Sequence, residues 1–256
     1  MSGESTVGIG LLLPDVLGTY SDRGNATVLA QRLGWRGIEA EVVTVTADSE
    51  PPAGCDVYVI GGGEDGAQAF AAEWLRRHEH LRTRLQTAHL LAVCAGLQVL
   101  GHWMEGVDGR RQPGLGILDV TTSPGRRRAV GEVVAGCALP GVGTLTGFEN
   151  HRGVTSLGPD TSPLAAVVKG MGNGTGDGGE GVLTSNVIGT YLHGPVLARN
   201  PALADHILQA VTGQELPPLQ LPDQEDVRRI HLAVADQRSP GRLRRVRAAL
   251  GRPRRS

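Results

Sequence analysis

Cys94 lies between an apolar segment and a run of small residues, which is a setting for a nucleophilic thiol. It follows the apolar run His89–Val93 and precedes Ala95 and Gly96. We expect a buried strand that turns sharply into a helix and presents the thiol at the carboxyl edge of a sheet, where the helix dipole favours thiolate. The alternative is that Cys94 is a small buried apolar side chain, as most free cysteines are.

A nucleophilic thiol needs a base to accept its proton, and histidine is the usual one. Among the eight histidines, His193 is the preferred candidate because it follows the apolar run Val187–Leu192 and so should also end a strand. His151, in the segment Gly147–His151, is the second candidate. His102 is expected two turns along the helix that follows the cysteine, where it would pack against its neighbours.

An acyl intermediate also needs hydrogen-bond donors for its oxyanion. Three consecutive glycines end the predicted strand Asp56–Ile60, the strand before the one that leads to the cysteine. We expect the backbone N–H groups of Gly62 and Gly63, together with that of Ala95, to point at the substrate carbonyl. The alternative is that the glycines serve only a turn.

Strands and helices alternate before Gly106. The expected strands are Val7–Leu13, Ile38–Val45, Asp56–Ile60 and His89–Val93, and the expected helices are Ala26–Leu33 (capped by Asn25), Gly66–Leu85 and Ala95–Met104. This order predicts an α/β fold, with a mostly parallel open sheet and helices on both faces.

After Gly106 the expected elements are short, rich in β-branched residues and separated by glycines. They are Leu115–Val120, Ala129–Val134, Thr144–Phe148, Leu164–Lys169 and Gly181–Thr184, followed by a last strand at Val187–Leu192 and a helix at Pro201–Thr212. We expect the short strands to form antiparallel hairpins appended to the sheet.

The formal net charge of −1 over 256 residues is unevenly distributed. The segment Arg238–Ser256 holds eight arginines and no acid, so the remaining 17 basic and 26 acidic residues leave the rest of the chain at −9. An acidic body argues against nucleic-acid binding. The three cysteines form no CxxC pair, which argues against a structural metal site and a disulfide framework.

The first residues lack a basic segment followed by a long apolar run, and no stretch holds the roughly twenty apolar residues that span a bilayer. We therefore expect a cytoplasmic protein without a transmembrane segment, whose thiols stay reduced. The arginine-rich tail is expected to be a solvated extension. The alternative is a short basic helix that contacts the anionic inner face of the membrane.

Together these residues resemble a class I glutamine amidotransferase. The segment Cys94–Gln98 matches the C-x-G-x-Q elbow of that superfamily, and Tyr191–Pro195 holds the late His-Gly motif of its cobyric acid synthase-type branch. Within this branch the chain is similar to the GatD family, the glutaminase subunits of lipid II isoglutaminyl synthase. The segments that carry this similarity are Pro14-Asp15, Asp22–Asn25, Trp35–Ile38, Gly61–Asp65 and Gly147–His151.

The resemblance implies a domain organisation and a role for each site residue. Residues 1–213 would form the amidotransferase domain, and residues 214–256 a Pro-containing linker with the arginine-rich extension. Cys94 would attack the side-chain amide of L-glutamine and form a thioester, while His193 transfers protons. Arg128 matches the family's arginine for the glutamine α-carboxylate, which a guanidinium can bind through two parallel hydrogen bonds. Its neighbours Arg126 and Arg127 leave that assignment open by one or two positions.

One position departs from the wider superfamily. Most triad amidotransferases carry Glu two residues after the catalytic His, where this chain has Pro195, and no acid follows until Asp205. The resemblance therefore implies a catalytic dyad, or a carboxylate supplied by another residue or another chain. In the GatD family the ligase subunit is thought to supply it, which would make the isolated glutaminase slow.

The resemblance also implies a heterodimer. Ammonia would pass to a Mur-ligase-like (MurT-like) subunit, which amidates the D-glutamate α-carboxylate of the lipid II stem peptide. Because this chain has no GxxxxGK[ST] loop, ATP and Mg²⁺ are expected on the partner and no cofactor in this chain. Another acceptor, such as a corrinoid carboxylate, stays open, as do a cysteine peptidase and a non-catalytic binding module on the same fold.

Overall fold

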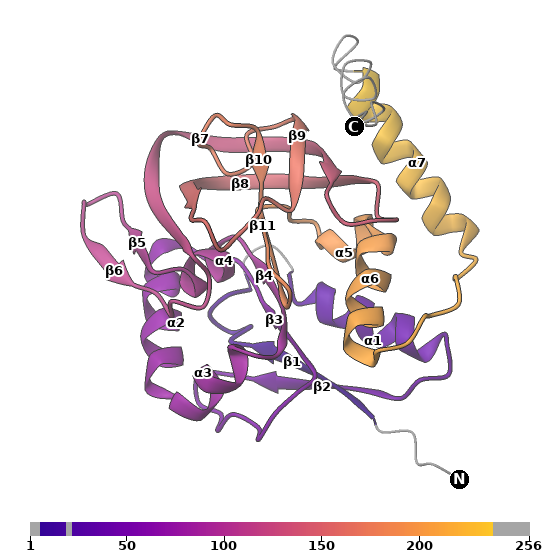
Figure 1. Ribbon diagram of the computed structural model, residues 1–256, viewed down its shortest axis with the longest axis horizontal. Helices are drawn as coiled ribbons and strands as arrows, with labels where there is room; N and C mark the ends of the chain where they lie inside the picture. The colour runs from indigo at the N-terminus through magenta and orange to yellow at the C-terminus, as the bar shows by residue number, and fades with distance from the viewer. Residues whose placement is uncertain (1–5, 19–21, 238–256) are drawn as a thin grey trace, which may run out of the picture.

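A six-stranded sheet lies at the centre of the chain, in the order β11-β12-β4-β3-β1-β2 (Figure 1). The structure, a computed structural model, describes residues 6–18 and 22–237. The strands are β1 (Val7–Leu12), β2 (Ala40–Val45), β3 (Val57–Ile60), β4 (His89–Val93), β11 (Val182–Leu183) and β12 (Val187–Thr190). All neighbours are parallel except β11 and β12. The expected, mostly parallel sheet is confirmed.

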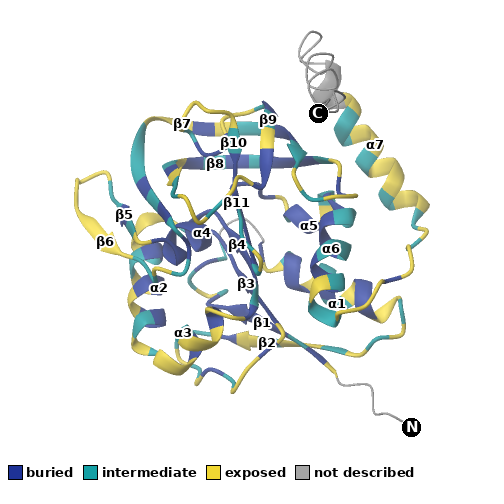
Figure 2. Ribbon diagram, in the orientation of Figure 1, coloured by how far each residue is buried: buried dark blue, intermediate teal, exposed yellow. Residues whose placement is uncertain are grey.

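The central strands are buried on both faces, which explains their continuous apolar sequences. Successive residues of β3 belong to different cores, because side chains alternate along a strand. Val57 and Val59 pack in one core, and Tyr58 and Ile60 in the other. Figure 2 shows these strands as a buried layer between the helices.

Three helices cover each face of this sheet. They are α1 (Gly24–Gly34), α5 (Val196–Arg199) and α6 (Pro201–Thr212) on one face, and α2 (Asp65–Arg77), α3 (Glu79–Leu85) and α4 (Ala95–Leu100) on the other. The helix expected over Gly66–Leu85 is in fact two helices, which meet at His78 (φ −91°, ψ 76°).

The helix after Cys94 is shorter than expected. It ends at Leu100 because Gly101 is extended (φ −72°, ψ −174°), and the chain then enters strand β5. His102 therefore lies outside the helix, where it is exposed and bonded to Asp119 at 3.0 Å rather than packed.

The expected cap of α1 is also wrong. Asn25 lies inside the helix, and its buried Oδ1 accepts the N–H of Leu197 at 3.0 Å. The amide thus ties α1 to α5 across the sheet face instead of closing the helix end.

A second sheet is built on two long antiparallel strands, where short hairpins were expected. Its strands are β5 (Trp103–Glu105), β6 (Arg111–Pro113), β7 (Val120–Cys137), β8 (Thr144–Leu157), β9 (Ala165–Lys169) and β10 (Gly179–Glu180). The register of β7 against β8 shifts between Pro124 and Ala129, where residues 125–128 lie opposite Arg152 alone. Such a bulge re-aims side chains locally.

A further helix, α7 (Pro222–Gln237), lies in the segment expected to be a linker. The Arg228 guanidinium anchors it by donating to the carbonyl oxygens of Arg199 (2.8 Å) and Thr144 (2.5 Å). Within residues 6–18 and 22–237, no helix is both long and apolar enough to cross a membrane. The basic tail from residue 238 onward lies outside the described residues.

Candidate functional site

Cys94 lies on a strained elbow between β4 and α4. Its backbone has φ 52° and ψ −107°, a conformation that residues other than glycine rarely adopt. The Cys94 N–H donates to the Thr190 oxygen at 2.8 Å, and the Gly96 N–H donates to the Gly61 oxygen at 3.1 Å, so both flanking strands fix the turn. A side chain at Gly96 would meet the Ile60 oxygen at 2.6 Å, which explains the glycine.

His193 follows the neighbouring strand β12 and is held by the second sheet. Its N–H and C=O exchange hydrogen bonds with the backbone of Phe148 in β8, at 2.8 and 3.1 Å. Because β12 lies directly beside β4, the imidazole and the thiol are brought to the same edge of the central sheet.

A carboxylate of this same chain contacts the imidazole. The Asp22 oxygens lie 3.1 and 3.2 Å from His193 Nδ1, and both side chains are almost fully buried. The sequence pattern did not identify Asp22 as the acid, because it lies 171 residues before His193 in a turn-rich segment. Asp205, the first acid after His193, instead pairs with Arg32 at 2.6 Å.

Gly62 marks the point where these three groups converge. A Cβ added there would lie 2.8 Å from His193 Cε1, 3.2 Å from an Asp22 oxygen and 3.3 Å from the Cys94 Cβ. Cys94, His193 and Asp22 therefore form one cluster around a position that only glycine can occupy.

The oxyanion role expected for Gly62 does not fit this arrangement. Its N–H donates to Asp22 Oδ2 at 2.9 Å, so the donor is already engaged with the carboxylate. Gly63 lines the cavity described below, and the Ala95 N–H faces the Cys94 sulfur. These two remain the candidates for oxyanion donors.

Burial, not the helix dipole, dominates the ionisation of Cys94. Desolvation raises the pKa of its thiol to about 12, with a further rise from the Asp22 charge, while the Ala95 N–H and the Arg128 charge oppose it. The sequence predicted that the helix N-terminus favours the thiolate, but burial outweighs that effect here and favours the protonated thiol.

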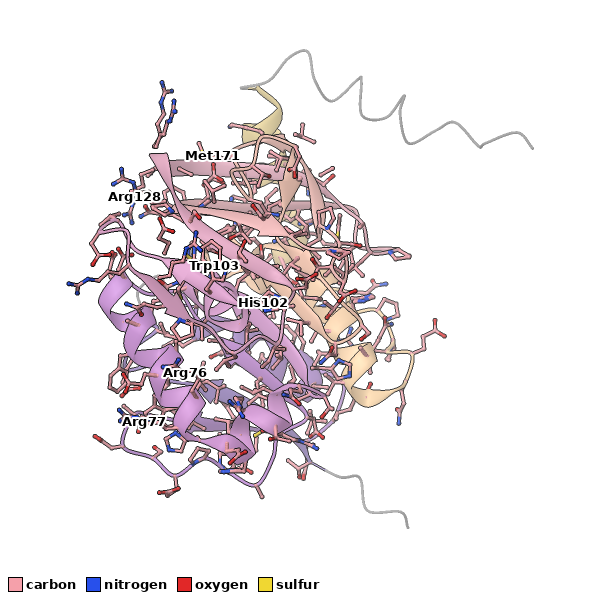
Figure 3. All side chains as sticks on the ribbon, turned by 60° about the vertical axis from the view of Figure 1, so that its left-hand side comes forward. Arg76, Arg77, His102, Trp103, Arg128 and Met171 are labelled. Atoms are coloured by element: carbon pink, nitrogen blue, oxygen red, sulfur yellow. The ribbon has the colours of Figure 1, made fainter. Side chains whose placement is uncertain are left out.

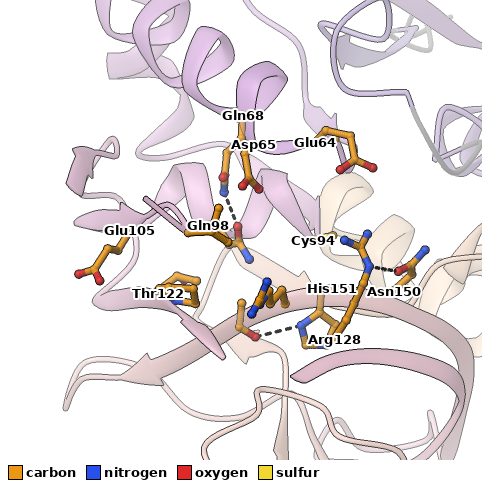
Figure 4. A pocket seen from close by; sticks show the side chains of 15 residues that line it. Glu64, Asp65, Gln68, Cys94, Gln98, Glu105, Thr122, Arg128, Asn150 and His151 are labelled. Atoms are coloured by element: carbon orange, nitrogen blue, oxygen red, sulfur yellow. Dashed lines mark hydrogen bonds between the residues drawn. The ribbon is translucent and has the colours of Figure 1, made fainter. Parts of the chain in front are cut away.

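A cavity of about 160 Å³ opens above the thiol (Figure 4). Cys94 and Gly63 line it, and so does Arg128, whose Nε donates to Asn150 Oδ1 at 2.6 Å. Arg126 and Arg127 do not line it. Of the three consecutive arginines, Arg128 is therefore the one placed to bind a ligand near the thiol.

The segment Gly147–His151 supports the cavity wall, a role that the sequence did not reveal. Glu149 accepts the N–H groups of Met171 and Gly172 at 2.9–3.1 Å, which fixes the loop after β9. Asn150 holds Arg128, as described above, and the His151 ring stacks on Tyr191 at 3.8 Å. His151 is thus a wall residue; the imidazole beside the thiol is His193.

The comparison with family models identifies this architecture. The model for the CobB/CobQ-like glutamine amidotransferase domain matches residues 8–201. The chain belongs to this family.

Two curated relatives are subunit GatD of lipid II isoglutaminyl synthase (glutamine-hydrolyzing). The protein from Staphylococcus aureus (strain N315) is 38% identical over 208 residues, 77% of this chain and 81% of the relative. The protein from Streptococcus pneumoniae (strain ATCC BAA-255 / R6) is 34% identical over 226 residues, 84% of this chain and 85% of the relative. A cobyric acid synthase from Pelotomaculum thermopropionicum is 33% identical, but the match spans 33% of its length.

Solved structures support the fold. A crystal structure of a glutamine amidotransferase superposes with a TM-score of 0.55 at 22% identity, over 80% of this chain and 98% of that chain. The glutaminase domain of a Trypanosoma brucei CTPS, with bound acivicin, superposes with a TM-score of 0.52 at 11% identity. This match covers 86% of this chain and 99% of that chain. The amidotransferase fold expected from the sequence is confirmed.

Proposed function

We propose that this chain is the glutamine-hydrolysing subunit of a lipid II isoglutaminyl synthase. The observation that carries the proposal is the convergence of Cys94, His193 and Asp22 on Gly62, beneath a cavity that Arg128 lines. The two GatD relatives support it, because each aligns with this chain over more than four fifths of its own length.

The hydrolysis proceeds through a thioester. Arg128 binds the glutamine α-carboxylate and places the side-chain amide over Cys94. As the sulfur bonds to the amide carbon, the thiol proton moves to His193, and the N–H groups of Gly63 and Ala95 stabilise the oxyanion. His193 then protonates the leaving nitrogen, and ammonia departs. Water attacks the thioester with His193 as base, which releases glutamate and restores the thiol.

The buried thiol explains why the base must be oriented. With a pKa of about 12, Cys94 loses its proton only as it attacks, so the imidazole must be positioned to accept it. Asp22 holds the Nδ1 side of the ring and stabilises the imidazolium that forms. Asp22 is therefore the positioning residue that we assign in place of an acid from the partner.

The ammonia is consumed by a second subunit. A Mur-ligase-like partner would activate the D-glutamate α-carboxylate of lipid II with ATP and Mg²⁺, and this chain would need no cofactor of its own. The complex would work in the cytoplasm, at the inner face of the membrane where lipid II is made.

Sequence similarity favours this acceptor over a corrinoid carboxylate. The two GatD relatives are 38% and 34% identical to this chain over 208 and 226 residues. The cobyric acid synthase from Pelotomaculum thermopropionicum is 33% identical over 180 residues. A non-catalytic binding module would not need a strained cysteine, a buried His-Asp pair and a glycine cradle together.

Glutamate release from glutamine tests the proposal. We expect turnover by the chain with its ligase subunit, and its loss in Cys94→Ser, in which the hydroxyl is a far weaker nucleophile in the same elbow. A circular dichroism spectrum and thermal midpoint unchanged from the wild type establish that the variant is folded. Equal turnover in the serine variant would remove the proposed chemistry.

A further inference from the structure

The two outer strands of the central sheet end it in different ways. At one edge, β11 is two residues long, and Ser162 covers it by exchanging backbone hydrogen bonds with Leu183 at 2.7 and 3.2 Å. At the other edge, β2 runs beside β1 over six residues without a bulge. Among the residues that the structure describes, no strand pairs with the outer side of β2 (Figure 1). This edge is therefore an open template for another strand.

The hydrogen bonds to β1 show which backbone groups of β2 face outward. The Leu13 N–H donates to the Val45 oxygen at 2.7 Å, so Val45 and every second residue before it turn their backbone groups toward β1. The residues between them turn their N–H and C=O groups to the outer edge, and these are Ala40, Val42 and Thr44. Exposed edge strands usually carry proline, lysine or a bulge against unwanted pairing, and β2 has none of these.

A groove runs along β2 on the side of α1. It measures about 310 Å³, and the exposed side chains of Val42 and Thr44 line it. Its other wall is one stripe of α1, made of residues at helical spacing, mostly small: Thr27, Ala30, Gln31 and Gly34. Trp35, 49% exposed, continues this stripe at the end of the helix. Because the stripe has so little bulk, it leaves room for a second helix beside α1.

We infer that the outer edge of β2 is the contact between two copies of this chain. In an antiparallel pair centred on Val42, this residue faces its own counterpart, and Ala40 faces Thr44 of the second copy. Each facing pair exchanges two backbone hydrogen bonds, because all these groups point outward. Glu41 then faces Val43 of the second copy, so no two acids are directly opposed.

The helices fit the same arrangement, which favours a second copy over an isolated peptide strand. Helix α1 packs over both β1 and β2. With strands about 4.8 Å apart, the two copies of α1 lie side by side with their axes about 10 Å apart. Packed helices are typically about 8–10 Å apart, so the second α1 fills the groove. Because the copies are antiparallel, the exposed Trp35 of each reaches the start of the other α1, where Arg23 lines the groove and can stack on the ring.

This pairing leaves both catalytic cavities open. Arg128, which lines the cavity, and Arg77, in the last turn of α2, lie at opposite ends of the molecule (Figure 3). The cavity lies at the carboxyl ends of the central strands, where Cys94 follows β4. Since the strands of the two copies run in opposite directions, their cavities open toward opposite ends of the dimer. Dimerisation therefore needs no glutamine hydrolysis, and hydrolysis needs no dimer.

Sedimentation velocity of the isolated full chain tests the inference. We expect the weight-average mass to rise toward twice that of one chain between low and high micromolar concentration. Val42→Lys sets two ammonium groups against each other at the centre of the pair. Gly34→Leu fills the groove, and a Cβ at Gly34 would meet no atom within 4 Å beyond its own helix, so the single chain tolerates it. Each variant should weaken the dimer at least about tenfold, whereas Val227→Lys, at an exposed valine of α7, is the matched control.

Hydrogen exchange followed by mass spectrometry locates the contact. Residues 40–44 should exchange more slowly at high concentration in the wild type and in the control, but not in the other two variants. Unchanged circular dichroism spectra and thermal midpoints establish that each variant is folded. A dimer of wild-type strength in either Val42→Lys or Gly34→Leu, its loss in the control, or exchange of residues 40–44 that does not depend on concentration would overturn the inference. A wild type that stays monomeric would also overturn it and leave the edge to a strand from another protein.

Discussion

Asp22 interacts with both the catalytic base and the nucleophile of the site. Its carboxylate binds His193 Nδ1 and the Gly62 N–H, and its charge raises the pKa of the Cys94 thiol. One side chain thus orients the base, holds the glycine turn after β3 and adds to the rise in the Cys94 pKa that burial causes. Substitution of Asp22 should separate these effects, because it should lower the rate of glutamine hydrolysis and raise the rate at which Cys94 is alkylated.

Asp22→Asn should lower kcat for glutamine hydrolysis by roughly 10²- to 10⁴-fold, because an amide cannot stabilise the imidazolium. The same change removes a negative charge beside the thiol, so its pKa falls and iodoacetamide alkylates Cys94 faster at pH 8. Steady-state kinetics and timed alkylation check both directions.

The control for this variant is a second His-Asp pair. Asp119 accepts from the exposed His102 at 3.0 Å, outside the cavity, so Asp119→Asn should leave kcat and alkylation unchanged. Full activity of Asp22→Asn in complex with the ligase subunit would contradict our assignment, since the partner would then supply the acid.

Arg128→Gln should act on glutamine binding. Loss of charged hydrogen bonds to the α-carboxylate should lower kcat/KM by about 10- to 100-fold, mostly through KM. The pKa of Cys94 should rise, because the Arg128 charge lowers it in the wild type. Initial rates over a range of glutamine concentrations measure the effect on the isolated chain. Arg127→Gln, beside it but outside the cavity, should behave as wild type, and equal effects in the two variants would refute the assignment.

At the scale of elements, β8 and β12 are joined by buried polar groups behind the catalytic imidazole. Gln98 accepts from Gln68 and donates to Tyr191, which bonds Thr155 of β8. Glu180 of β10 accepts the Thr190 hydroxyl at 2.8 Å and the Tyr191 N–H at 2.7 Å. These contacts fix the chain immediately before His193.

Glu180 should make stability depend on pH. Burial raises the pKa of its carboxyl to about 7, so folding favours the protonated form. That contribution is complete below about pH 4.5 and is lost as the pH rises to about 7, at a cost of roughly 3 kcal/mol. In Glu180→Gln this dependence should vanish. Urea unfolding at pH 5 and pH 8 measures the free energy of unfolding of the wild type and of Glu180→Gln. If the two proteins differ by the same free energy at both pH values, the prediction is contradicted.

At the scale of the whole molecule, α7 is a helix bonded to the body of the chain, within the segment that the sequence predicts to be a linker. Arg228 reaches carbonyl oxygens of β8 and of the end of α5, and Arg32 of α1 donates to Gln224 at 3.0 Å. Outward-facing Val227 and Ile230 of α7 remain exposed. The helix is therefore held by polar contacts at a few points rather than by a large apolar face.

Arg228→Ala should release α7 without affecting catalysis. Three carbonyl or amide oxygens lose a charged donor, so the helix should exchange its amide hydrogens faster and be cleaved earlier by trypsin. Hydrogen exchange followed by mass spectrometry measures the protection of residues 222–237. Arg229→Ala, an exposed neighbour paired with Asp226, is the control. Unchanged protection in Arg228→Ala would show that other contacts dock the helix.

Local sequence determined the elements whose signal is strong and unambiguous. The bounds of β4 and α6 agree with the predicted ones, because an apolar run and an initial Pro201 are sufficient signals. The elbow at Cys94 and the strand before His193 were predicted for the same reason. The full length of β7 was not, since the bulge at residues 125–128 interrupts the alternation that would have joined its parts. Strand β8 was predicted only over Thr144–Phe148.

Tertiary structure alone decided what completes the site. Asp22 meets His193 from 171 residues away, and Arg128 is separated from its equally charged neighbours only by the geometry of a bulge. The pKa of Cys94 likewise depends on how deeply the fold buries it, a quantity that no local pattern contains. The residue types and their order therefore predict the chemistry. Contacts across the sheet edges decide which carboxylate, which guanidinium and which protonation state take part, because distance and desolvation exist only in the folded chain.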